Sequence, residues 1–258
     1  MSPRTADGSA GDADYGLIGG AYSDYRQADP RIAAHVEQAL AGARTVVNVG
    51  AGAGSYESAA FDVTPVEPSA SMRAQRPAHL PAAIDAVAER LPLADDAFDA
   101  AMTTFSIHQW SDPAAGLREM RRVARGPVAV LTCDPARVRD FWLYDYAPLV
   151  LDTEAARYPA IADITAALGG RAEVATVPVP ADCTDGFNEA YYARPERLLD
   201  PAARRSCSAW SFVTPDQDRA YTEHLRADLA SGAWDARYGA VRERPYLEGS
   251  LVLVRALP

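Results

Sequence analysis

Lysine is absent from this 258-residue chain, so every fixed positive charge belongs to an arginine. The 35 aspartates and glutamates outnumber the 25 arginines, and the formal net charge is −10. Non-specific binding of nucleic acid requires a basic surface that meets the phosphates. The charge balance excludes such a surface, and we predict no nucleic-acid partner.

Cysteine is scarce as well, with only Cys133, Cys183 and Cys207, far apart in the chain. No C-x-x-C pair or cluster of cysteine and histidine has the spacing of a metal site, so we predict no metal. Widely spaced cysteines in odd number are typical of reduced thiols. This pattern predicts a cytoplasmic protein.

Long apolar runs are also lacking. No run approaches the 18 residues that would indicate a membrane span, and no apolar segment near Met1 suggests a secretory signal. Residues 1–14 are mostly Gly, Ala, Ser and Asp and are predicted to form a disordered tail. The remaining 15–258 are long enough for a single domain with its own core.

The most informative segment of the chain is 45–54. Its first half is apolar and rich in β-branched residues, which predicts a buried parallel strand. Gly50, Gly52 and Gly54 then alternate with alanines. Glycine permits a tight turn and lets a ligand approach bare backbone, so ligand binding is a better interpretation than an ordinary turn.

A second apolar run, Val63–Val66, ends at Glu67. An acid at the tip of the second strand is placed to bind the hydroxyls of a nucleotide ribose. The connection Ser55–Asp62 leaves room for two turns of helix at most, and the glycines follow G-x-G-x-G rather than G-x-G-x-x-G. A dinucleotide would lose much of the helix dipole that holds its pyrophosphate, whereas S-adenosylmethionine carries no phosphate. The spacing favours S-adenosylmethionine and leaves an NAD(P)-dependent oxidoreductase as the alternative.

Strands and helices alternate along the chain, which predicts an α/β fold with a doubly wound, mostly parallel sheet. Asp29 and Pro30 are typical of a helix start, and Gly42 is expected to end that helix. Further strands are predicted at Ala83–Val87, Phe98–Phe105, Pro127–Cys133, Ala172–Val179 and Gly249–Ala256. Further helices are predicted at Pro113–Ala124, within 137–168 and within 195–231.

Residues from Tyr25 to Asp134 resemble the class I S-adenosylmethionine-dependent methyltransferases, in particular the small-molecule branch that includes quinone-biosynthesis enzymes. Val46–Gly54 is similar to the first motif of that family, and Val66–Ser69 to the second. The stretches 88–93, 98–110 and 117–123 look like the family's adenine-flanking segment, its fourth strand and the helix that follows. Two departures are the short first connection and Asn48, where the family often has Asp.

The resemblance implies a seven-stranded sheet with its last strand antiparallel and helical insertions in the C-terminal half. It also implies a cofactor half, 15–134, and an acceptor half, 135–258. Arg26 is expected to meet the carboxylate of the cofactor. The residues that motifs and resemblance together indicate for the cofactor are Tyr25, Arg26, Asn48, Gly50, Ala51, Gly52, Gly54, Glu67, Pro68, Met72, Ala88, Glu89 and Thr104.

His108 is the first candidate for a catalytic base, because it follows the fourth strand at the carboxyl edge of the sheet and its side chain titrates near neutrality. A structural histidine in a turn is the alternative. Tyr146 and His224 are further candidates. The aromatic residues of the acceptor half indicate an apolar or aromatic ligand pocket.

The sequence therefore predicts methyl transfer from S-adenosylmethionine to an O, N or C atom of a small metabolite, with secondary metabolism as the expected setting. The reaction would be an in-line displacement in which the protein mainly aligns the reactants and excludes water. A monomer or homodimer is expected. The alternative within the same fold is a protein that binds the cofactor without transferring its methyl group.

Overall fold

The computed structural model describes residues 7–8 and 22–258, and the side chains from 24 onward in the second range. Most of the predicted tail 1–14, its boundary with the domain and most of the aromatic segment before Arg26 lie outside the described residues.

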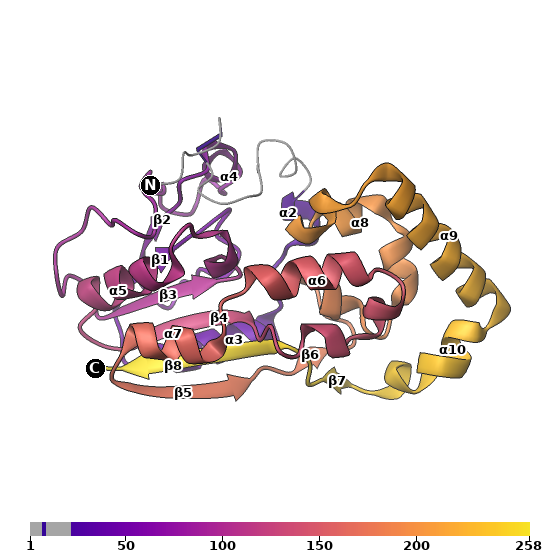
Figure 1. Cartoon of the computed structure of the whole chain (residues 1–258). Coiled ribbons are helices and arrows are strands. Elements are labelled where there is room, and N and C mark those ends of the chain that lie inside the picture. The colour runs from indigo at the N-terminus through magenta and orange to yellow at the C-terminus, as the bar shows by residue number, and fades with distance from the viewer. Residues whose placement is uncertain (1–6, 9–21) are drawn as a thin grey trace.

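A six-stranded sheet organises the fold, in the order β2-β1-β3-β4-β8-β5 (Figure 1). The first four strands of that order run parallel, and β8 is antiparallel to both of its neighbours. The predicted mostly parallel sheet with an antiparallel last strand is confirmed. The strands are β1 (Thr45–Val49), β2 (Asp62–Val66), β3 (Ala100–Thr104), β4 (Val128–Cys133), β5 (Arg171–Thr176) and β8 (Leu251–Leu257), and β6 (Val179–Pro180) and β7 (Tyr246–Leu247) form a separate ladder.

Alternation of side chains along the strands divides the core into two layers. Val46 and Met102 face α3 (Pro30–Ala39) together with much of the C-terminal half. Val47, which follows Val46, and Ala101, which precedes Met102, face the opposite side of the sheet. There α5 (Pro113–Val123) and α7 (Ile161–Leu168) cover the sheet.

The predicted helix starts are confirmed by their caps. The Asp29 carboxylate accepts the backbone N–H of Arg31 at 2.9 Å, and Pro30 is the first helical residue. Asp112 caps α5 in the same way through the N–H of Ala115. An unpaired N–H at a helix start is stabilised by such an acceptor, which fixes where each helix begins.

The predicted strand Ala83–Val87 is wrong in extent, because only Ile84 pairs with β2, through one parallel bridge to Val66. Alanine and aspartate, which surround Ile84, are poor strand formers. The described sheet therefore has six strands instead of seven. The short connection after β1 contains no helix at all, so the crossover to β2 is irregular.

The C-terminal half is mostly helical; α7 covers the sheet, and most of the other helices of this half lie beside it in Figure 1. Trp234 and Leu225 are completely buried there and join the same core as the α3 face of the sheet. No helix among the described residues combines the length and apolar character needed to cross a bilayer. The remaining α-helices are α2 (Tyr22–Tyr25), α4 (Ala70–Ala74), α6 (Pro148–Arg157), α8 (Pro201–Arg205), α9 (Pro215–Ser231) and α10 (Ala233–Tyr238).

Candidate functional site

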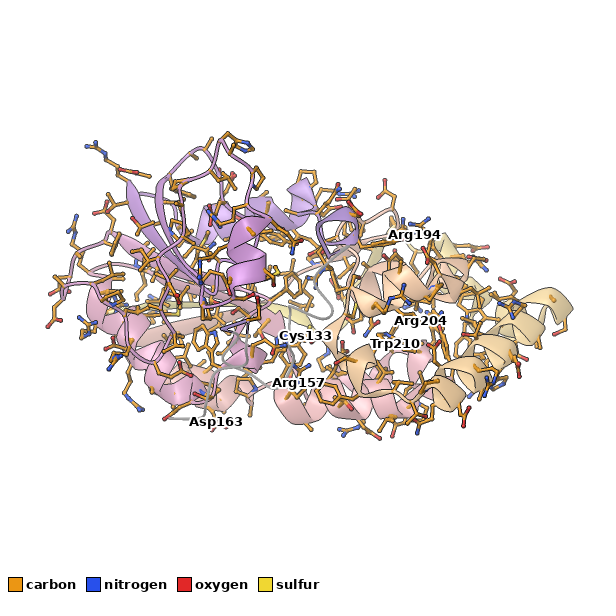
Figure 2. All side chains as sticks on the ribbon, turned by 90° about the horizontal axis from the view of Figure 1, so that it is seen from above. Cys133, Arg157, Asp163, Arg194, Arg204 and Trp210 are labelled. Atoms are coloured by element: carbon orange, nitrogen blue, oxygen red, sulfur yellow. The ribbon has the colours of Figure 1, made fainter. Side chains whose placement is uncertain are left out.

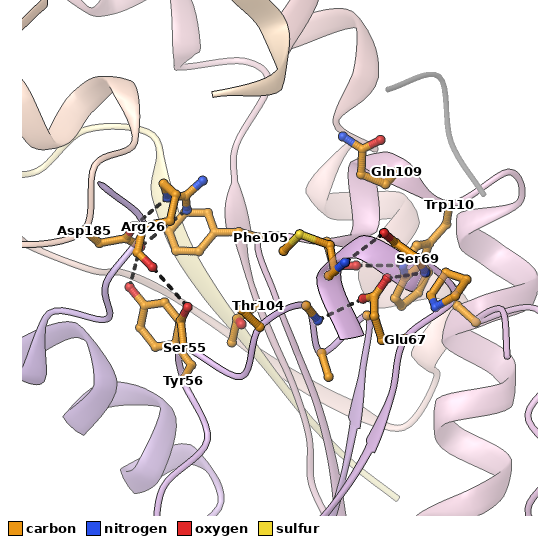
Figure 3. A pocket seen from close by; sticks show the side chains of 18 residues that line it. Arg26, Ser55, Tyr56, Glu67, Ser69, Thr104, Phe105, Gln109, Trp110 and Asp185 are labelled. Atoms are coloured by element: carbon orange, nitrogen blue, oxygen red, sulfur yellow. Dashed lines mark hydrogen bonds and ion pairs between the residues drawn. The ribbon is translucent and has the colours of Figure 1, made fainter. Parts of the chain in front are cut away.

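A cleft opens at the carboxyl ends of β1, β2 and β3, where the sequence predicts the cofactor (Figure 3). Ligands of open α/β sheets bind at this edge because the strand-to-helix connections leave a crevice there. The described residues that line the cleft are Arg26, Gly50, Ala51, Gly52, Ala53, Ser55, Tyr56, Glu67, Pro68, Ser69, Met72, Ala88, Thr104, Phe105, Ser106, Gln109, Trp110 and Asp185.

The floor of the cleft depends on a close approach between the ends of β1 and β3. Gly50 has φ +71°, and a β-carbon on it would lie only 1.8 Å from Ser106 Oγ. Trp110 Nε1 donates to that same oxygen at 3.1 Å. Glycine at this position therefore serves both the turn and the packing, while Trp110 forms a wall of the cleft.

Glu67 lies at the tip of β2 with its carboxylate held by backbone amides. Gly52 N–H donates to Oε2 and Ser69 N–H to Oε1, each at 2.8 Å. Burial raises the pKa of Glu67, and these two amides oppose the shift. Each carboxylate oxygen can accept two hydrogen bonds and accepts one of these, so one acceptor site on each remains for a ligand. A vicinal diol matches this pair of free acceptors.

An ion pair lies at the other end of the cleft. Arg26 Nε donates to Asp185 Oδ1 at 2.6 Å, and Tyr56 Oη donates to Asp185 Oδ2 at 2.8 Å. The Arg26 guanidinium also lies 4.9 Å from the centre of the Phe105 ring. Figure 3 shows these side chains facing one another across the cleft from Glu67. The cleft thus offers the Glu67 carboxylate at one end and both charge signs at the other.

Nine of the predicted cofactor residues line the cleft: Arg26, Gly50, Ala51, Gly52, Glu67, Pro68, Met72, Ala88 and Thr104.

Four predicted cofactor residues lie outside this lining. Tyr25 donates its hydroxyl to Asp200 at 2.7 Å. Glu89 accepts hydrogen bonds from the Ser111 hydroxyl and the Asp112 N–H, at the start of α5.

The other two, Asn48 and Gly54, lie behind the glycine turn. Asn48 Nδ2 donates to Glu57 Oε1 at 3.0 Å. Gly54 has φ +90°, and a β-carbon there would lie 2.5 Å from Leu80 Cδ1. Neither residue lines the cleft.

Several lining residues were not predicted. Trp110 and Phe105 lie inside a segment that carries the resemblance, so position along the motif was an available signal. Ser69 caps α4 by accepting the Met72 N–H, a recognisable helix start. Asp185 lies in an irregular loop, 159 residues along the chain from its partner Arg26, and no local sequence pattern indicates it.

His108 lies beside the cleft, in the 3₁₀ turn Ile107–Gln109 whose last residue is part of the lining. Its ring packs against Tyr158 with the ring centres 4.7 Å apart. Nδ1 is buried and has no hydrogen-bond partner among the described residues. Burial, followed by the positive charges of Arg157 and Arg26, lowers the pKa of His108 well below its usual value. The imidazole is therefore neutral near pH 7.

A partly buried carboxyl group, Glu154, lies near Tyr158, the residue that packs against His108. Glu154 Oε1 accepts the side-chain amide of Asn188 at 2.8 Å, and Trp210 Nε1 fixes that amide by donating to Asn188 Oδ1 at 3.0 Å. Burial raises the pKa of Glu154 to about 7, with a further contribution from the carboxylate of Glu189. Figure 2 shows Trp210 and Arg157 together in this region between the sheet and the C-terminal helices.

Tyr146 and His224, the other predicted catalytic residues, lie together but in a different groove, of about 660 Å³. Tyr146 donates its hydroxyl to Asp228 at 2.7 Å, and the two rings are 4.7 Å apart. Neither residue lines the cleft at the carboxyl ends of the strands. No group of three or more potential metal ligands occurs within residues 7–8 and 22–258.

Known proteins match this chain over the region that builds the cleft. A family model of a methyltransferase domain matches residues 47–128. YafE of Escherichia coli strain K12, an uncharacterized protein, is 42% identical over 60 residues, and this match spans 22% of the present chain and 29% of YafE.

Solved structures match over nearly the whole chain. A protein of Anabaena variabilis, assigned as a methyltransferase of an antibiotic biosynthesis pathway, has a TM-score of 0.83 and 28% identity, covering 90% of this chain and 98% of its own. The [4+2]-cyclase SpnF has a TM-score of 0.54 and 17% identity, covering 95% and 93%, which shows a shared fold.

These matches agree with the resemblance seen in the sequence: a methyltransferase domain matches residues 47–128, and the chain shares the fold of the Anabaena variabilis protein. The cleft offers groups that fit S-adenosylmethionine. Gly50, Ala51, Gly52 and Ala53 line the cleft with their turn, and the remaining acceptor sites of Glu67 match a ribose diol.

Proposed function

We propose that this chain transfers the methyl group of S-adenosylmethionine to an O, N or C atom of a small apolar or aromatic acceptor. The observation that carries the proposal is the carboxylate of Glu67, which two backbone amides orient toward the cleft with an acceptor site left on each oxygen. Ala88 and Trp110 would contact the adenine, and Glu67 would hold the ribose hydroxyls. When bound, the cofactor supplies a methyl group on a positively charged sulfur, a good leaving group for in-line displacement.

The methionine end of the cofactor belongs at the ion pair. Its α-ammonium group matches the Asp185 carboxylate, and its α-carboxylate matches Arg26. Both side chains are held before the ligand arrives, since Asp185 also accepts from Tyr56 and is almost fully buried. Such preorganisation reduces the entropy lost on binding.

The acceptor lies on the side of His108 and Glu154, next to the methyl-bearing end of the cleft. A neutral imidazole accepts a proton from an attacking O–H or N–H group, as a general base does. The Glu154 carboxyl group favours an acceptor that donates a hydrogen bond. Phe105 and Tyr158 exclude water and provide apolar contact for the rest of the molecule.

Calorimetric titration with S-adenosylmethionine, S-adenosylhomocysteine and NADH tests the cofactor assignment, with Glu67→Ala as the matched variant. We expect micromolar binding of the two sulfur nucleosides by the wild type, weakened at least tenfold in the variant. Binding of NADH alone would restore the oxidoreductase alternative. Cofactor binding without methyl transfer to any aromatic amine, phenol or enol offered would favour the alternative of a binding protein on the same fold.

A further inference from the structure

The glycine turn is supported by a buried ion pair in place of a helix. Glu57, in the irregular crossover after β1, forms two hydrogen bonds with Arg76: Nη2 donates to Oε2 at 2.7 Å and Nη1 to Oε1 at 3.1 Å. The side chains are only 1% and 4% exposed. A buried ion pair costs desolvation energy, so its presence beneath a ligand-binding turn calls for a functional explanation.

The ion pair holds the Gly52 peptide directly. Arg76 Nη1 donates to the carbonyl oxygen of Gly52 at 3.3 Å, while the N–H of Gly52 donates to Glu67. Arg76 Nη1 would also lie 3.1 Å from a β-carbon on Gly54. One guanidinium group thus fixes the turn from behind, and through Gly52 it fixes the carboxylate of Glu67.

Asn48 is the third member of this cluster. Its Nδ2 donates to Glu57 Oε1 at 3.0 Å, and its Oδ1 is buried without a partner among the described residues. Because a carboxylate only accepts hydrogen bonds, the amide nitrogen must face Glu57. An aspartate at position 48 would place a second carboxylate against the first, and two carboxylates in one site cannot both stay ionised easily.

We propose that Asn48, Glu57 and Arg76 are positioning residues that fix the Gly52 peptide for cofactor binding, in place of the helix that is absent from the first crossover. The two departures of the sequence from the methyltransferase pattern then have one cause. Glu57 and Arg76 support the glycine turn where the crossover has no helix. Asn48 stands in place of the common aspartate because Glu57 already supplies the negative charge. The inference rests on the proposed cofactor site.

An exchange of the charge between positions 48 and 57 tests the inference. Asn48→Asp adds a second carboxylate, and Glu57→Gln leaves Arg76 without its counter-charge. We expect each single variant to bind S-adenosylhomocysteine at least tenfold more weakly than the wild type. The double variant keeps one carboxylate and one amide in contact, and we expect its dissociation constant to return to within threefold of the wild type.

Three measurements separate the possible outcomes. Glu173→Gln removes the charge from an exposed pair with Arg171 and should leave the dissociation constant unchanged. If the pair were merely structural, the single variants would lower the melting temperature and leave the affinity of the folded protein intact, which would overturn the inference. Additive losses of affinity in the double variant would also overturn the inference. If a single variant fails to fold, the affinity of the double variant decides the test.

Amide hydrogen exchange provides a test that needs no ligand. We expect Glu57→Gln to speed exchange at least tenfold at Gly52 and Gly54, with little change in the strand β4. Unchanged exchange at both glycines would overturn the inference even in a protein that binds the cofactor. A wild-type chain that fails to bind S-adenosylhomocysteine but shows the expected exchange would refute the proposed function alone.

Discussion

Ser106 Oγ occupies the space that a β-carbon on Gly50 would need, and the two atoms would be 1.8 Å apart. The end of β1 and the loop after β3 are therefore packed backbone against side chain at the floor of the cleft. A residue other than glycine would have to displace Ser106 and, with it, the hydrogen bond from Trp110.

Gly50→Ala should destabilise the protein and abolish cofactor binding. An alanine in the left-handed region costs about 1–2 kcal/mol, and overpacking adds about 1–3 kcal/mol. Urea denaturation and calorimetry with S-adenosylhomocysteine measure the two effects. Gly42→Ala is the control, because Gly42 has φ +91° with nothing near its β-carbon position. Gly42→Ala should lose only the free energy of unfolding that an alanine at positive φ costs. Equal losses of unfolding free energy in the two variants would contradict the packing argument.

Asp185→Asn should weaken binding of the amino-acid part of the cofactor. The loss of a charge-assisted hydrogen bond, about 1.5–3 kcal/mol, predicts an affinity for S-adenosylhomocysteine that is about 10- to 100-fold lower. 5′-Methylthioadenosine lacks the α-ammonium and α-carboxylate groups, so its affinity should not change. Equal weakening of both ligands would mean that Asp185 acts only through the fold. Tyr56→Phe, which removes one hydrogen bond to Asp185 and no charge, should have a smaller effect.

An exposed histidine takes up a proton near pH 6.5. His108 in the folded protein should still be neutral below that pH. Its pKa lies well below 6.5 because it is buried, whereas the unfolded chain binds a proton near that value. The unfolded state then binds more protons as the pH falls below 6.5, so the native state loses stability there. Relative to His108→Gln, the wild type should lose about 1–2 kcal/mol between pH 7.5 and pH 5. Urea denaturation at both pH values checks this, and a protonated His108 in the NMR spectrum at pH 6 would refute it.

Glu154 should give the opposite pH dependence. Its pKa is raised from 4.5 to about 7 by burial, so between these values the folded state holds a proton that the unfolded state has released. The native state loses stability as the pH rises through this window, and the loss persists above it. Glu154→Gln keeps an acceptor for Asn188 and carries no charge. The difference in unfolding free energy between this variant and the wild type should therefore grow in favour of the variant from pH 5 to pH 8, to at most about 3 kcal/mol. An equal difference at both pH values would show that Glu154 is not shifted.

Whether a site residue could be predicted depends on how close together in the chain the residues of its sequence pattern lie. Gly50, Gly52 and Glu67 could be predicted because a buried strand, a glycine turn and a second strand place them within about 20 residues of one another. Asn48 and Gly54 belong to the same segment but do not line the cleft: the Asn48 side chain donates to Glu57, and the β-carbon position of Gly54 faces Leu80 and Arg76. Sequence spacing defines where the backbone runs there, while the direction of each side chain depends on what packs against it.

Tyr146 and His224 illustrate a different limit. Both are aromatic or titratable side chains in the half of the chain that lies beyond the cofactor segment, which is why they were candidates. The structure brings them together in a groove of their own, on α9 and the turn before α6. Composition predicts which side chains are chemically able to act, but only packing decides which of them meet the cleft.

The sequence by itself determined four parallel strands, the helix starts at Pro30 and Pro113, the glycine turn and the resemblance that indicates the cofactor, because each arises from residues close together in the chain. The tertiary structure decided the ion pair of Arg26 with Asp185 and that of Glu57 with Arg76. Partners 159 and 19 residues apart meet only when the sheet and the loops around it have formed. Their charges are stable in the interior only because each finds the other there, which no local pattern specifies.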